Sequence, residues 1–147
     1  MRYVASLVLL HASCSAYTAV GVTVPFAILA RGLSSGVAEP TQIVVRSPTE
    51  WAALWSRHMR TPTAPPPSVD FAHDMVVALF LGERTTGGYA VEITQIERTD
   101  VGLLIRYRTT KPDPNTMQTQ AFTQPFLMVK LARVDGPVTF ICESVSR

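Results

Sequence analysis

Residues 75–89 read MVVALFLGERTTGGY, and this stretch decides the fold. Its first part, residues 75–81, is a continuous apolar run whose length is typical of a strand buried on both faces. From Tyr89 to residue 94 apolar and polar residues alternate, as in a half-buried strand. Residues 83–87 must therefore reverse the chain, and their glycines permit positive φ angles there. Because loops on a rigid sheet often carry recognition, the pattern favours a binding module over an enzyme.

The beginning of the chain predicts a secretory signal peptide over residues 1–16. Arg2 supplies a short basic start, residues 3–10 are apolar, and small residues follow as far as Ala16. The apolar run is shorter than the roughly 20 residues that a membrane span needs. We therefore expect export to the periplasm, the cell envelope or the extracellular space. Lipid attachment at Cys14 is an alternative that the pattern leaves open.

Length and charge predict one globular domain, over residues 24–147. About 130 residues are left after removal of the signal, which is the usual size of a single domain. Thirteen Lys and Arg nearly balance eleven Asp and Glu, so a basic nucleic-acid-binding face is not expected.

Cys142 would be the only cysteine of the mature chain, which excludes an internal disulfide. Its apolar neighbours Phe140 and Ile141 favour a buried thiol.

The periodicity predicts a mainly β fold with one helix. Ser47 followed by Pro48 and Glu50 is a capping box that starts a helix, whose apolar stripe contains Trp51 and Trp55. Asp135-Gly136 predicts a hairpin between the last two strands. The expected fold is an antiparallel β-sandwich or open barrel with one packed α-helix. Seven strands are expected, at 25–31, 42–46, 75–81, 89–97, 103–108, 126–133 and 138–142.

The sequence shows no catalytic or metal-binding pattern. The two histidines after the signal, His58 and His73, lie in no recognisable nucleophile motif. Two histidines and one cysteine are too few for a zinc site of three or four ligands. Residues 82–88 lack the Lys-Ser/Thr ending of a phosphate-binding loop and precede a strand. We therefore expect a non-enzyme with no cofactor and no metal.

Candidate partner-binding residues occur in two segments. Arg84 and Tyr89 are of types enriched at interface hot spots, and the neighbouring glycines allow close approach of a backbone. The second segment ends the irregular stretch 109–124, whose length is typical of a functional loop. A purely structural role for both segments is the alternative. The full set is Arg84, Thr85, Thr86, Gly87, Gly88, Tyr89, Thr123, Gln124, Pro125 and Phe126.

Three motifs in order resemble the C-terminal domain of the protease complex subunit PrcB family: 69–71 (VDF), 82–89 (GERTTGGY) and 120–126 (QAFTQPF). With the upstream tryptophan helix, the resemblance covers residues 24–142. Thr85 departs from the pattern, which more often has proline there. The resemblance implies an exported accessory protein that associates with a secreted peptidase and supports its maturation or stability, without catalytic residues. The positions that carry the motif are Asp70, Phe71, Gly82, Arg84, Thr86, Gly87, Gly88, Tyr89, Thr123, Pro125 and Phe126.

A second likeness leaves other functions open. Residues 85–89 (TTGGY) are similar to the Thr-Thr-Gly-Tyr loop of the chagasin-type inhibitors of cysteine peptidases, which implies inhibition. A third alternative is an envelope structural domain that self-associates through an edge strand or Cys142. All three hypotheses expect a protein partner and no nucleic acid, with membrane contact only through a lipid anchor.

Overall fold

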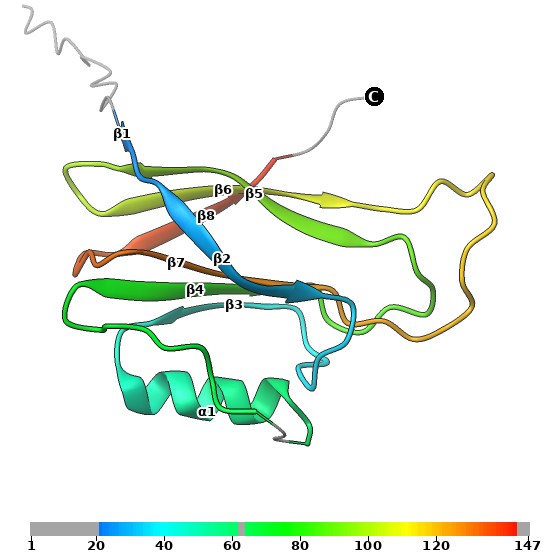
Figure 1. The fold of residues 1–147 in the computed structure, drawn as a ribbon. Helices are drawn as coiled ribbons and strands as arrows, with labels where there is room; N and C mark the ends of the chain where they lie inside the picture. Colours follow the sequence, from blue (N-terminus) through cyan, green and yellow to red (C-terminus); the bar gives the residue numbers. More distant parts are fainter. Residues whose placement is uncertain (1–20, 62–63, 144–147) are drawn as a thin grey trace, which may run out of the picture.

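The computed structural model describes residues 21–61 and 64–143. Over these residues the chain forms eight strands and one helix in three layers, with two four-stranded sheets stacked and the helix beneath one of them (Figure 1). One sheet has the strand order β1-β5-β6-β8 and the other β2-β7-β4-β3. The elements are β1 (Val22–Thr23), β2 (Phe26–Gly32), β3 (Thr41–Val45), α1 (Pro48–His58), β4 (Asp74–Phe80), β5 (Ala90–Arg98), β6 (Leu103–Thr110), β7 (Phe126–Ala132) and β8 (Val138–Cys142).

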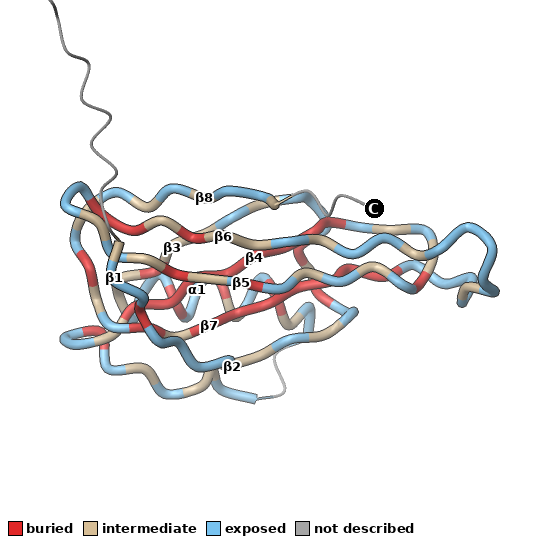
Figure 2. Tube along the Cα trace, turned by 90° about the horizontal axis from the view of Figure 1, so that it is seen from above, coloured by how far each residue is buried: buried red, intermediate tan, exposed pale blue. Residues whose placement is uncertain are grey.

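The central strands β4 and β7 are buried on both faces, as the apolar run predicted (Figure 2). Met75 and Leu79 of β4 point into the core between the two sheets. Val76 and Phe80 alternate with them and point into the core beneath α1. Burial of each such side chain is worth about 1.5–3 kcal/mol. The sheet that contains β4 and β7 therefore contributes side chains to two cores, one on each face. The prediction of a β-sandwich with one packed helix is confirmed.

Helix α1 begins at the predicted capping residues. The Ser47 Oγ accepts a hydrogen bond from the Glu50 backbone N–H at 3.3 Å, and the Glu50 carboxylate accepts one from the Arg46 N–H at 2.9 Å. Trp51 is buried against the sheet, and Trp55 packs at the edge of the same core. The apolar stripe of the helix therefore packs onto the sheet, as predicted.

The predicted hairpin at Asp135-Gly136 is wrong. Strand β8 lies in the other sheet from β7 and pairs with β6, in parallel. Both edges of β7 are already occupied, by β2 and β4, so the following strand has no free edge on which to fold back. Residues 83–87 likewise carry the chain from one sheet to the other rather than between paired neighbours.

Strand β5 contains a feature that strict alternation did not predict. A bulge lies between Ile93 and Gln95, and it brings Ile96 onto the buried face together with Ile93. Without the bulge, alternation would place Gln95 and Glu97 in the core. Strand β1, which pairs with the end of β5, was also not predicted.

The predicted burial of Cys142 is also wrong, because its thiol is exposed. Cys142 is the last residue of β8, an edge strand, and although alternation puts it on the same face as Val138 and Phe140, it is exposed where they are half-buried. The predicted signal peptide (1–16) and Cys14 lie outside the described residues. Among the residues described, no helix has the length and apolarity needed to cross a membrane.

His58 is a buried titratable residue beside the core beneath α1, which contains Phe80 and Phe126 and which we call the helix-side core. Its Nδ1 lies 2.9 Å from the Ser35 Oγ, and its ring packs edge-on against Phe126 at a centroid distance of 4.3 Å. Burial lowers the pKa of His58 below its ordinary 6.5, because the charged imidazolium is poorly solvated there.

Acidification is therefore expected to destabilise the fold through His58. The unfolded chain takes up the proton near pH 6.5 and the folded chain only at lower pH, so stability is complete above pH 6.5 and declines as the pH falls toward the folded-state pKa. Urea unfolding at pH 7.5, 6.5 and 5.5 should show this decline in the wild type and a weaker one in His58→Gln.

The control for this experiment is His73→Gln. Asp70, 2.8 Å from the exposed His73 ring, raises the pKa of His73, so its contribution has the opposite sign and is lost as the pH rises. Removing His73 should leave the decline on acidification in place. Equal slopes for wild type and His58→Gln would contradict the assignment.

Candidate functional site

The two predicted segments meet at one end of the sandwich. Arg84 and Thr123 form an antiparallel bridge, with the Arg84 N–H donating to the Thr123 carbonyl at 2.7 Å and the Thr123 N–H to the Arg84 carbonyl at 2.9 Å. The Gly87 N–H donates to the Thr119 carbonyl at 2.9 Å. We call residues 82–89 and 111–125 the paired-loop end, which projects beyond both sheets in Figure 1.

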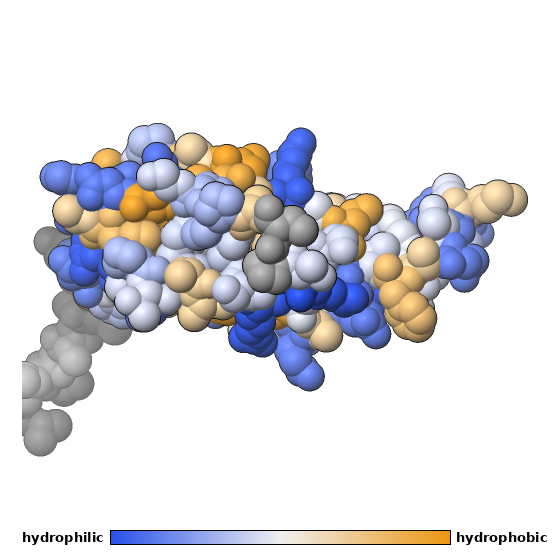
Figure 3. Space-filling model, turned by 60° about the horizontal axis from the view of Figure 1, so that its bottom comes forward, coloured by the Kyte–Doolittle hydropathy of each residue, from blue (hydrophilic) through white to orange (hydrophobic). Residues whose placement is uncertain are grey.

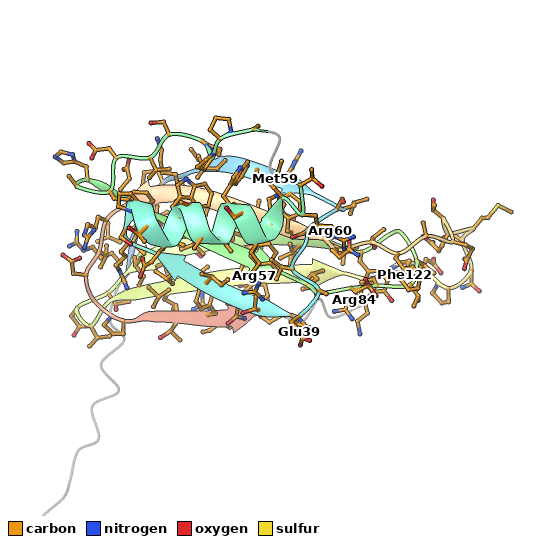
Figure 4. The ribbon with its side chains drawn as sticks, turned by 90° about the horizontal axis from the view of Figure 1, so that it is seen from below. Glu39, Arg57, Met59, Arg60, Arg84 and Phe122 are labelled. Atoms are coloured by element: carbon orange, nitrogen blue, oxygen red, sulfur yellow. The ribbon has the colours of Figure 1, made fainter. Side chains whose placement is uncertain are left out.

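Arg84 lies at the base of the paired-loop end (Figure 4). Its Nη2 donates to the Leu81 carbonyl at 2.9 Å, and its guanidinium carbon lies 5.3 Å from the centroid of the Tyr89 ring, a cation–π contact. The Arg84 Nε is buried and has no hydrogen-bond acceptor in the described part of the chain. Arg84 and Tyr89 are both half-buried, so each presents only part of its side chain to solvent.

The other residues of the first predicted segment differ in exposure. Thr85 and Gly88 are exposed, Thr86 is half-buried and Gly87 is buried beneath the second loop. The Thr86 carbonyl accepts a hydrogen bond from the Thr123 hydroxyl at 2.9 Å. Only part of this segment therefore forms accessible surface.

The residues predicted in the second segment hold the paired loops in place, and all four are buried. The Gln124 side chain donates to the Glu83 carboxylate at 3.1 Å, and the Pro125 carbonyl accepts from the Leu81 N–H at 2.9 Å. Phe126 belongs to the helix-side core. The four are Thr123, Gln124, Pro125 and Phe126.

The sequence prediction missed two apolar residues on the surface of the second loop. Met117 is fully exposed and Phe122 is 68% exposed. Figure 3 shows separate apolar patches on a projecting arm that is otherwise polar, and Figure 4 shows Phe122 farther from the body than Arg84. Large apolar residues within a polar, proline-containing loop were a signal that could have found them.

A cleft opens at the base of the paired-loop end, between β3 of one sheet and β6 of the other. It has a volume of about 480 Å³, and Arg84 and Tyr107 line it. A smaller cavity of about 210 Å³ adjoins it, lined by Tyr89 and Lys111 as well as Arg84. Across the described ranges 21–61 and 64–143, no three His, Cys, Asp or Glu side chains gather to hold a metal ion.

These features define a β-sandwich domain whose joined loops form one end. Residues 75–132 match the family model described as PrcB C-terminal. The match runs through β4, β5, β6 and β7 and contains both loops, so it supports the family resemblance seen in the sequence over this part of the chain. No curated protein and no solved structure matches the chain.

Proposed function

We propose that the chain is an exported, non-catalytic binding module that serves as an accessory or stabilising subunit of a secreted peptidase. The paired-loop end is its contact surface. Arg84 and Tyr89 contribute at its base, and Met117 and Phe122 form the apolar contacts farther out. Export places the domain in the periplasm, the cell envelope or the extracellular space, where such a peptidase acts.

The observation that carries the proposal is the bridge between Arg84 and Thr123, within the family match. Backbone hydrogen bonds join two loops that lie far apart in the sequence, so the loops form one platform on a rigid sandwich. A pre-ordered platform loses less conformational entropy on binding than a free loop does. Phe122 and Met117 stand at its surface as aromatic and thioether anchors of the kind that interfaces use.

The proposal is tested by co-purification from the native host. The full-length sequence, with a C-terminal tag, is expressed in place of the wild-type protein, and the tagged protein is recovered from the envelope and from the medium. We expect a peptidase to co-purify, identified by mass spectrometry and by its activity on casein. Arg84→Ala/Tyr89→Ala should reduce its recovery by at least about tenfold, the effect of losing about 1.4 kcal/mol of binding free energy.

The matched control is Asp100→Ala/Val101→Ala, in the turn at the opposite end of the sandwich (Figure 1). This variant should recover as much peptidase as the wild type. Equal loss in both double variants, with both proteins folded, would move the interface away from the loops. Absence of a peptidase from every sample would refute the accessory role. Recovery of a peptidase that is inactive until released would indicate the inhibitor function instead.

A further inference from the structure

The cleft and its smaller neighbour form one continuous site around Arg84. Leu81, Arg84 and Thr109 line both cavities, whose volumes are about 480 and 210 Å³. Together they are within the size range of sites that bury a small ligand or one or two amino-acid residues. We call this combined site the Arg84 cleft.

The lining of the Arg84 cleft is cationic and rich in hydrogen-bonding groups. Arg84 and Lys111 supply positive charge, and no Asp or Glu lines either cavity. Gln42 of β3 donates to the Tyr107 hydroxyl of β6 at 2.7 Å, which joins the two sheets across the cleft. A group that binds here therefore meets positive charge and polar side chains at once. The polar groups of the lining are Thr41, Gln42, Tyr107, Thr109 and Thr110.

The guanidinium of Arg84 is held in place, but most of its N–H donors have no hydrogen-bond acceptor among the described residues. A guanidinium has five N–H donors, and among the described residues that of Arg84 has one acceptor, the Leu81 carbonyl. The buried Nε without an acceptor costs about 1–3 kcal/mol, which an apolar residue at this position would avoid. None of the ion pairs within the described residues involves Arg84. A buried donor that lacks an acceptor in the folded protein is typical of a group that hydrogen-bonds to a ligand.

We propose that the Arg84 cleft binds a carboxylate of a polypeptide partner, with Arg84 as its ion partner and Leu79, Leu81 and Val91 in contact with the adjoining apolar side chain. A planar guanidinium matches the two oxygens of a carboxylate. Phosphate sites often use a helix N-terminus, and no residue of α1 lines this cleft. The inference rests on the proposed function and names the chemistry by which the partner is bound.

The test is a titration followed by NMR at the Nε–H resonance of Arg84 in the 15N-labelled protein. The probes are N-acetyl-leucine, which has a free α-carboxylate, N-acetyl-glutamate α-amide, which has only a side-chain carboxylate, N-acetyl-leucine amide and inorganic phosphate. At least one of the two carboxylates should give a saturable shift with a millimolar dissociation constant, and the amide none. The carboxylate that binds more tightly shows whether the partner supplies a C-terminal carboxylate or that of an acidic side chain.

Two variants test whether the carboxylate binds at the Arg84 cleft. Arg84→Gln should weaken the carboxylate affinity at least tenfold, read from the backbone resonances of Val91 and Thr109, and Arg98→Gln, at the far end of β5, should leave it unchanged. If Arg84→Gln does not fold, Lys111→Gln replaces it, with an expected loss of two- to fivefold. The absence of a saturable shift, equal binding of the amide, or tighter binding of phosphate would overturn the proposal.

The outcome is separable from that of the co-purification. A peptidase that co-purifies although no carboxylate binds would refute the Arg84 cleft and leave the accessory role intact. Carboxylate binding without any co-purifying peptidase would support the cleft as a site and refute the accessory role.

Discussion

Replacing Phe126 by alanine is expected to lower the free energy of unfolding by about 3–5 kcal/mol. Phe126 is 7% exposed and contacts the rings of both Phe80 and His58. Its removal leaves a cavity where strand β7 meets the helix-side core, at the point where the second loop enters the sheet. A domain of this size is typically stable by only 5–15 kcal/mol, so the change removes a large share of its stability.

Urea unfolding followed by tryptophan fluorescence measures this loss, since Trp51 and Trp55 pack in the same core. Phe122→Ala is the matched control: the same substitution four positions earlier, at a side chain that is 68% exposed, should change stability by less than about 0.5 kcal/mol. Phe126→Leu, which keeps most of the volume, should cost less than Phe126→Ala. A similar loss for Phe122→Ala and Phe126→Ala would contradict the burial on which the argument rests.

The helix and every described strand except β1 could be predicted because their signals are local. Residues 75–81 are apolar at every position since both faces of β4 are buried, and the capping residues of α1 act within one turn of the chain. The connection after β7 could not be predicted in the same way. Asp135-Gly136 is a local turn signal, whereas the partner of β8 depends on which strand edges are free, and β2 and β4 occupy both edges of β7.

In the candidate site, too, some features could be predicted from local sequence and others depend on the rest of the fold. The family motif correctly selected two segments that lie together, through the bridge between Arg84 and Thr123. The motif does not state which way each side chain points. Phe122 and Phe126 stand in one short segment and have opposite environments, one on the surface and one in the core. The cleft around Arg84 is formed by β3, β5 and β6 as well, so no single stretch of sequence contains it.

Gly82→Ala is expected to destabilise the fold by about 2–4 kcal/mol, although it adds only one methyl group. Gly82 has a φ of +74°, where an L-residue loses about 1–2 kcal/mol. A Cβ at this position would also lie 2.8 Å from the Ala38 carbonyl oxygen, which accepts a hydrogen bond from the Glu83 N–H. The methyl group therefore displaces the backbone that anchors the start of the first loop. Thermal and urea unfolding of the variant measure the loss.

Gly87→Ala distinguishes this backbone effect from a general intolerance of side chains in the loop. Gly87 is also buried, but its φ is not positive, and an added Cβ would make an ordinary contact with the Thr119 Cβ at 3.4 Å. Alanine there should cost less than about 1 kcal/mol, because it also reduces the entropy of the unfolded chain. If the two variants lose the same stability, the left-handed backbone at Gly82 is not what the loop requires. If Gly82→Ala alone unfolds, the glycine that follows β4 sets the position of Arg84, two residues later, and with it both the paired-loop end and the cleft.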